Sequence, residues 1–178
     1  MQHSRRTNTV IATFKTSRQA LRAVNELVLH GVSDTQLSIL VWRGANRLLA
    51  PPIGDVVGGA AAGQLAGAVL AALTASSTAT IPEVNALGTG PLMDALAGVH
   101  LRVAPTASLA ERLMLLGFDA AAAESIDASF KNGDIVLGVD THDHDLSGLA
   151  ARTFVRQGAQ TGAGVAPAAT PAASSPRS

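Results

Sequence analysis

Residues 140–145 hold the densest group of side chains in this sequence that could do chemistry. They read Asp-Thr-His-Asp-His-Asp, so two imidazoles and three carboxylates fall within six positions, directly after an apolar run. Imidazole nitrogens and carboxylate oxygens are ligands that zinc and other divalent cations take in proteins. The candidate metal ligands of this chain are therefore His142, His144 and Asp140.

The same six residues also fit a polar turn that joins a strand to a helix. Asp143 or Asp145 would then cap the helix that follows, because an aspartate oxygen accepts hydrogen bonds from the free N–H groups of a first helical turn. No second cluster of His, Cys or Asp occurs elsewhere in the sequence to complete a metal shell. We therefore expect a capped turn here, without a bound metal or another cofactor.

Other residues with chemical potential have simpler explanations. His30 falls in the last turn of a predicted helix, where a positive charge suits the helix dipole. His100 lies among apolar residues and is expected to be a half-buried histidine. The glycines of residues 53–59 lack the Gly-x-Gly-x-x-Gly spacing and a lysine for phosphates, and no Gly-x-Ser-x-Gly elbow occurs. The sequence thus indicates no catalytic residues and no cofactor-binding residues.

The composition excludes several classes of protein. The 178 residues include 13 Lys+Arg and 13 Asp+Glu, so no excess positive charge is present to hold a nucleic acid backbone. Because the chain has no cysteine, disulfides and thiolate chemistry are excluded. The N-terminal residues do not contain the long apolar stretch of a secretory signal. We expect a cytoplasmic protein with no nucleic acid partner and no evident small-molecule substrate.

Hydrophobic periodicity and capping residues predict the secondary structure. Alternating apolar residues indicate strands at 10–14, 37–41 and 135–139. Three helices are predicted to begin after capping residues and to end at glycines; these are Thr16 to Gly31, Ser108 to Gly117, and Asp119 to Gly133. Two more helices are expected at 91–97 and 146–157, the second ended by Gly158.

The first and last of these units follow the same order. Each has an apolar strand, a threonine (Thr16 or Thr141), an amphipathic helix, and a glycine followed by a small or apolar residue. This repeat suggests two related halves that face each other in one sheet. We therefore predict a mixed α/β (α+β) protein, with a ferredoxin-like or related small sheet, helices on one face and a glycine-zipper helical insert.

The expected domain organisation has three parts. A flexible N-terminus covers residues 1–8, and a single α/β domain covers 9–158, with the helical insert at 54–100. Residues 159–178 are rich in Ala, Pro and Ser and show almost no periodicity. Such a segment buries too little apolar surface to offset the entropy of ordering, so we expect a disordered tail.

The insert holds the most distinctive pattern of the sequence, which is a small residue at every fourth position. On a helix over about residues 55–76 these residues would share one smooth face; they are Gly59, Gly63, Gly67, Ala71 and Ala75. A smooth face lets another helix approach closely, as small residues do in membrane helices. The pattern leaves three uses open: packing within the chain, self-association between protomers, and membrane association.

A topological constraint bears on the last of these uses. The apolar stretch at 56–75 approaches the length of a membrane span. A single span would place the strands before and after it on opposite sides of the bilayer, where they could not share a sheet. Membrane association would therefore require an oligomer or a peripheral, partly embedded hairpin.

Several short motifs, taken in order, resemble the bacterial general stress protein 17M-like (low-temperature-induced protein) family. They are Val10-Ile11-Ala12, Leu29-His30-Gly31-Val32, Leu37-Ser38-Ile39-Leu40-Val41, Gly90-Pro91-Leu92, Leu116-Gly117-Phe118 and Gly133-Asp134-Ile135-Val136-Leu137. The resemblance extends over about residues 8–157. It implies an α/β sandwich with a glycine-rich helical insert and a stress context, and it brings no catalytic residues.

We expect, on these grounds, a stress-associated protein that is not an enzyme. It would act through self-association, as a homo-oligomer, or through partner binding at the small-residue face of the insert. The first alternative is a peripheral or embedded membrane-associated protein that uses the same insert. The second alternative is a divalent-metal binder built on His142 and His144.

Overall fold

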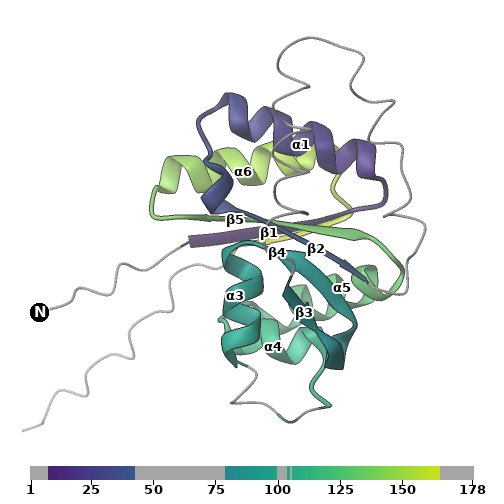
Figure 1. The fold of residues 1–178 in the computed structure, drawn as a ribbon. Coiled ribbons are helices and arrows are strands. Elements are labelled where there is room, and N and C mark those ends of the chain that lie inside the picture. Colours follow the sequence, from purple (N-terminus) through teal and green to yellow (C-terminus); the bar gives the residue numbers. More distant parts are fainter. Residues whose placement is uncertain (1–7, 43–78, 100–103, 105, 165–178) are drawn as a thin grey trace, which may run out of the picture.

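A computed structural model of the chain describes residues 8–42, 79–99, 104 and 106–164. Their six strands form one antiparallel sheet in the order β3-β4-β2-β5-β1-β6 (Figure 1). The strands are β1 (Asn8–Phe14), β2 (Leu37–Trp42), β3 (Ala79–Ile81), β4 (Ala86–Thr89), β5 (Ile135–Thr141) and β6 (Thr161–Gly164). The helices are α1 (Ser17–Leu29), α3 (Pro91–Gly98), α4 (Leu109–Leu115), α5 (Ala120–Lys131) and α6 (His144–Arg156), with short 3-10 turns η1 (Asp34–Gln36) and η2 (Pro82–Val84).

Two strand-helix-strand units meet at the centre of the sheet. β1 pairs with β5 from Asn8 opposite Thr141 to Phe14 opposite Ile135. α1 connects β1 to β2, which lie on either side of β5, and α6 connects β5 to β6, which lie on either side of β1. The prediction of a mixed α/β fold is confirmed, and the two halves suggested by the sequence repeat lie side by side in one sheet.

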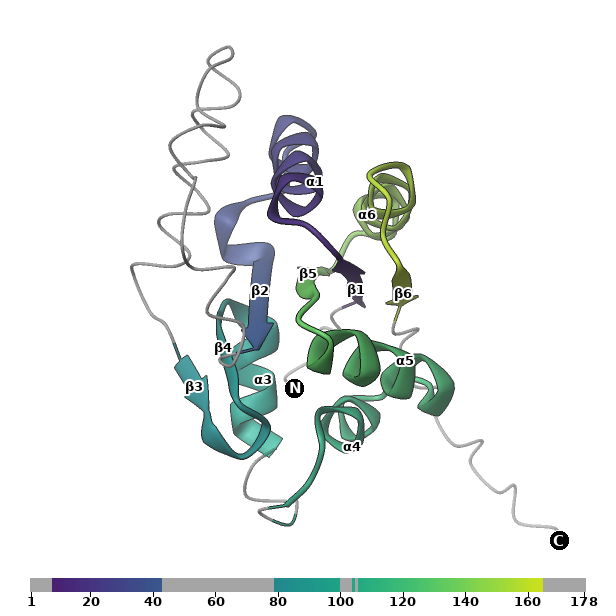
Figure 2. The same cartoon turned by 90° about the vertical axis from the view of Figure 1, so that its right-hand side faces the viewer.

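Helices cover both faces of the sheet, so the prediction of helices on one face is wrong (Figure 2). α1 and α6 pack on one face, where the rings of Phe14 and Phe154 meet edge to face with centroids 5.7 Å apart. α3, α4 and α5 pack on the other face, against Ile11 and Val136. The reason is that β1 and β5 carry apolar side chains at consecutive positions, which point to opposite faces and must both be buried.

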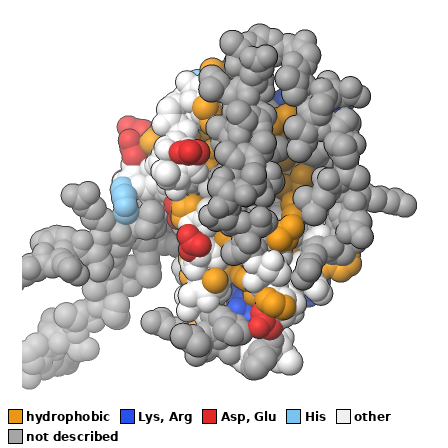
Figure 3. All heavy atoms as spheres, in the orientation of Figure 1, with side chains coloured by type: hydrophobic (Ala, Val, Ile, Leu, Met, Phe, Trp, Pro, Cys, Tyr) orange, Lys and Arg blue, Asp and Glu red, His pale blue; other side chains and the backbone are white. Residues whose placement is uncertain are grey.

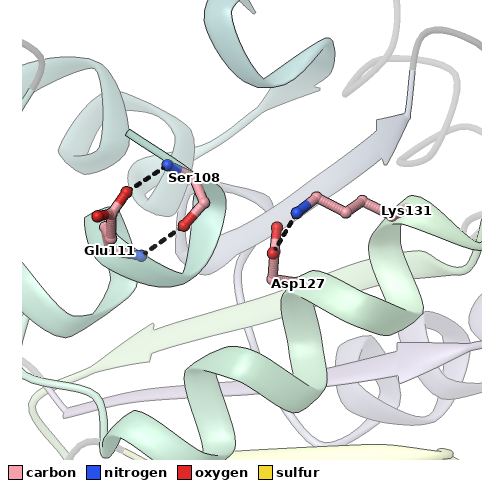
Figure 4. Close-up of polar contacts among 4 residues, drawn as sticks. All are labelled: Ser108, Glu111, Asp127 and Lys131. Carbon is pink, nitrogen blue, oxygen red and sulfur yellow. Dashed lines mark hydrogen bonds and ion pairs between the residues drawn. The ribbon is translucent and has the colours of Figure 1, made fainter. Parts of the chain in front are cut away.

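The predicted helix ends are confirmed where capping residues define them. Ser108 Oγ accepts a hydrogen bond from the N–H of Glu111 at 3.2 Å, and Glu111 Oε2 accepts one from the N–H of Ser108 at 2.7 Å (Figure 4). Asp119 caps the start of α5. At the other end Nζ of Lys131, the last residue of the helix, lies 2.6 Å from Oδ2 of Asp127, one turn earlier. The closing glycines all have positive φ angles; they are Gly31, Gly117, Gly133 and Gly158.

Two predicted boundaries differ from the structure. Residues 79–99, placed in a helical insert, form β3, η2, β4 and α3, so this part of the insert mainly extends the sheet beside β2. Residues 161–164, placed in a disordered tail, form β6 and pair with β1 from Val10 opposite Gly164 to Thr13 opposite Thr161. β4 and β6 contain small residues such as glycine and alanine, so their sequences show little alternation of apolar and polar side chains. They still pair, because the hydrogen bonds between strands join backbone groups only. The predicted helix at 55–76 and its small-residue face lie outside the described residues.

A matched pair of glycines tests how closely α3 approaches the sheet. Gly31 (φ +91) has no atom within 4 Å of the position of a Cβ, whereas a Cβ on Gly90 (φ +96) would lie 2.2 Å from the carbonyl oxygen of Leu37. Gly31→Ala should lower the free energy of unfolding by about 1 kcal/mol, the cost of a left-handed residue. Gly90→Ala should lower it by about 3 kcal/mol, because steric overlap adds to that cost.

Urea unfolding of both variants measures the difference. Equal losses at the two positions would show that β2 does not contact the start of α3 as described.

Candidate functional site

A cleft of about 470 Å³ lies at the end of the sheet where β1 begins and β5 ends. One wall comes from β1, β5 and η1 and is mostly polar, and the other comes from α3 and the turn between α4 and α5 and is apolar. The polar residues are Thr9, Thr35, Gln36, Asp140, Thr141 and His142, and the apolar residues are Pro91, Ala95, Leu116 and Phe118. The cleft therefore offers a carboxyl group, an imidazole and hydroxyl groups beside an apolar surface.

The register of β1 and β5 brings the central polar pair together. Thr9 lies directly opposite Asp140, and strand alternation places both on the sheet face of Ile11 and Gly138. Thr9 Oγ1 donates a short hydrogen bond to Asp140 Oδ1. Within the described residues this is the single hydrogen bond that the carboxyl group of Asp140 receives.

The environment of Asp140 disfavours its charged form. Burial against the sheet end raises the pKa of its carboxyl group above the ordinary value, because water is partly removed from the carboxylate. The Thr9 hydrogen bond and the nearby His142 act in the opposite direction and lower this pKa, but their effect is smaller than that of burial. A further hydrogen-bond donor or positive charge in the cleft would therefore stabilise the charged form of the Asp140 carboxyl group.

Close packing of α3 on the sheet positions the apolar wall. Ser38 Oγ in β2 accepts a hydrogen bond from the N–H of Leu92 at 2.9 Å and so holds the first turn of α3. A Cβ on Gly138 in β5 would lie 3.1 Å from Leu92 Cδ2, so the Leu92 side chain packs closely on this strand. These contacts set Pro91 and Ala95 in the lining of the cleft, which also includes Asp140.

The structure separates the three candidate metal ligands. Asp140 and His142 line the cleft together. His144 begins α6, and its Nδ1 lies 3.3 Å from Nδ2 of Asn8, which alternation places on the face covered by α1 and α6. Across the residues that the structure describes, no three His, Asp or Glu side chains are grouped as metal ligands.

The turn between β5 and α6 has the capped form expected from the sequence. Asp143 Oδ1 accepts hydrogen bonds from the N–H groups of Asp145 at 2.7 Å and Leu146 at 3.3 Å. The N–H of Asp143 itself donates to Thr141 Oγ1 at 3.0 Å. Histidine and acidic side chains are visible on this edge of the molecule, at the left of Figure 3. Of the other histidines, His30 is the exposed C-cap residue of α1, and His100 lies outside the described residues.

Sequence reasoning missed most of the cleft. Thr9 and Thr35 come from segments far from Asp140 along the chain, and no motif links them to it. Leu116 and Phe118 enter the sequence analysis only within one of the short motifs of the resemblance, which carries no site. The one available signal was the polar pair Thr9 and Asp140 at the ends of two apolar strands, and it becomes a site only when the strands are paired in this register.

Comparison with protein-family models, with curated proteins and with solved structures found no match to this chain. A search of the described helices found none with the length and apolar character required to cross a bilayer. The site is therefore interpreted from its own geometry.

The Asp140 environment makes a pH-dependent prediction. Thr9→Val removes the hydrogen bond to the carboxylate, and His142→Gln removes the nearby positive charge, so each should raise the pKa of Asp140 further. Titration of the side-chain carboxyl carbon by NMR measures this directly. A lowered pKa in either variant would contradict the described contacts.

The raised pKa of Asp140 also makes the stability of the protein depend on pH. Between the unfolded pKa and the higher folded pKa of Asp140, the folded state binds more protons than the unfolded state. The contribution of Asp140 to the free energy of unfolding should therefore fall as the pH rises through this interval and then level off. Asp140→Asn should remove that fall in a pH series of urea unfolding.

A second prediction concerns metal binding. Because His142 lines the cleft and His144 contacts Asn8, zinc should not change the melting temperature of the protein, and neither should a chelator. The double variant His142→Ala, His144→Ala should behave as the parent does in both conditions. A zinc-dependent rise in melting temperature that the double variant loses would show that a metal binds the folded state.

Proposed function

We propose that this chain is a non-catalytic protein that associates with copies of itself or with a partner through the small-residue face of residues 55–76. The support is the fourfold spacing of small residues, which on a helix makes a surface that a second helix can approach closely. Those residues are Gly59, Gly63, Gly67, Ala71 and Ala75. A stress context and a cytoplasmic location, suggested by the resemblance and the composition, belong to the same proposal.

The observation that carries this proposal is the fourfold spacing of small residues, and the described part of the chain supplies a folded domain with two hydrophobic cores beside it. One core joins β1, β2 and β5 to α1 and α6 and includes Phe14, Leu27 and Phe154. The other joins the opposite face to α3, α4 and α5 and includes Leu92 and Phe130. Both faces of the central strands are thus covered by described helices, and the proposal for residues 55–76 rests on the spacing of their small residues.

The strand order also supports a finer assignment of the fold. Four of the strands lie in the order β6-β1-β5-β2 and are connected by α1 and α6. This order and these connections are those of a ferredoxin-like unit. We assign that unit to the two repeated halves of the sequence. The chain between β2 and β5 is then an insertion, which adds β4 and β3 to the sheet and α3, α4 and α5 to its second face.

Gly63→Leu tests the association face. A leucine side chain at the centre of that face would hold two helices apart and remove their close contacts. We expect the variant to lose self-association, measured by size-exclusion chromatography with light scattering, while the folded domain remains. Ala61→Leu is the matched control, because on a helix over residues 55–76 residue 61 would lie on the side opposite Gly63, so the change should leave assembly unchanged.

Three outcomes count against the proposal. Unchanged assembly in Gly63→Leu would mean that the small-residue face contacts no other protomer. An unfolded monomer would mean that the face packs inside the domain. Partitioning of the parent protein into lipid vesicles, lost in Gly63→Leu, would favour the membrane-associated alternative.

A further inference from the structure

The cleft at the ends of β1 and β5 has the size and the mixed lining of a small-molecule site. Its volume of about 470 Å³ lies within the range of about 300 to 1,000 Å³ that is typical of ligand pockets. Such pockets combine an apolar surface with a few polar groups that fix the orientation of the ligand. Here the apolar surface comes from α3 and the α4–α5 turn, and the polar groups come from β1 and β5.

Asp140 supplies an unused hydrogen-bond acceptor in this cleft. Its Oδ1 accepts the Thr9 hydroxyl, and no described residue donates to its Oδ2. A carboxylate can accept several hydrogen bonds, and those from a charged donor are about twice as strong as neutral ones. The side chain is half-buried, so a donor that reaches Oδ2 interacts with a carboxylate that water only partly solvates.

The charges of the lining favour a positive ligand. Among the described residues of the cleft, Asp140 is the one acidic side chain, and neither lysine nor arginine is present. His142 is the one basic group among the described residues that line the cleft. An anion would meet the carboxylate of Asp140 without a permanent positive charge to bind it.

The apolar wall of the cleft favours a ligand that also has an apolar group. Pro91 and Ala95 on α3 and Phe118 after α4 lie across the cleft from the polar wall. Burial of an apolar group against them is favourable at about 25 cal/mol for each Å² removed from water. A ligand with an ammonium group at one end and a compact apolar group at the other matches both walls.

We propose that this cleft binds a small organic amine, with its ammonium group donating to Asp140 and its apolar body packed on Pro91, Ala95 and Phe118. This proposal does not rest on association through residues 55–76. It lies where the polar ends of β1 and β5 meet the α3 layer, and it does not include His144.

Three probes of the same shape and different charge test the proposal. Benzylamine, benzyl alcohol and benzoate are titrated into the full ¹⁵N-labelled chain at about pH 8, well above the ordinary pKa of an aspartic acid side chain. Benzylamine should shift the amide signals of Thr9, Phe118 and Asp140 saturably. Benzyl alcohol should bind more weakly, and benzoate should not bind at the cleft.

Asp140→Asn keeps an acceptor for the Thr9 hydroxyl but removes the charge, and it should weaken benzylamine binding by about tenfold or more. Asp145→Asn is the matched control, because Asp145 is an exposed residue of α6 outside the cleft and should leave the affinity unchanged. Ala95→Leu fills the cleft from α3 and should weaken benzylamine and benzyl alcohol alike.

The proposal is overturned if benzylamine does not bind saturably at millimolar concentrations. It is also overturned if Asp140→Asn binds benzylamine as the parent does, or if benzoate binds the cleft as tightly as benzylamine. Because the three probes are compared on the same folded parent protein, the comparison among them does not depend on the stability of the variants. The results are also independent of whether Gly63→Leu alters assembly.

Discussion

Seven residue pairs join β1 to β5 at the centre of the sheet, and the apolar side chains on both faces of this pair are buried. Val10 points to the α1 and α6 layer, while Ile11 points to the layer of α3, α4 and α5. A strand pair buried on both faces must satisfy its N–H and C=O groups within the sheet, because no water reaches them. The two helical layers exist because this central pair has to be covered on both sides.

The same pairing produces the cleft. Beyond the pair Val10 and Val139, the next residues are Thr9 and Asp140, so the ladder passes from apolar to polar pairs at this end. A slip of one residue would turn Asp140 toward α1 and α6 and leave Thr9 without it. Packing against both helical layers opposes such a slip, since a slip would move each buried side chain of the slipped strand to the opposite layer, where it would have to fit a different set of neighbours. The stability of the core thus fixes the geometry of the polar pair.

The insertion between β2 and β5 turns this sheet end into a two-walled site. α3 approaches β2 and β5 closely enough that Gly90 and Gly138 leave no room for larger residues. α4 is held beneath it with Arg112 fully buried, 4.0 Å from Glu83 in η2. No described residue accepts a hydrogen bond from the Arg112 guanidinium group, so its burial depends on the packing of the surrounding apolar side chains and on the charge of Glu83. Without this layer the sheet face of Thr9 and Asp140 would be exposed.

The sequence by itself determined the local elements, because their signals lie within a few residues of each other. Alternating apolar residues marked β1, β2 and β5, and side-chain caps at Thr16, Ser108 and Asp119 marked three helices. Only the tertiary structure decided which strands are neighbours, that helices cover both faces, and that β6 forms from small residues. It also decided that Asp140 lies with Thr9 and His142, while His144 contacts Asn8. These outcomes depend on pairing between segments more than a hundred residues apart, and strand register is set by burial across the whole sheet, which no local pattern records.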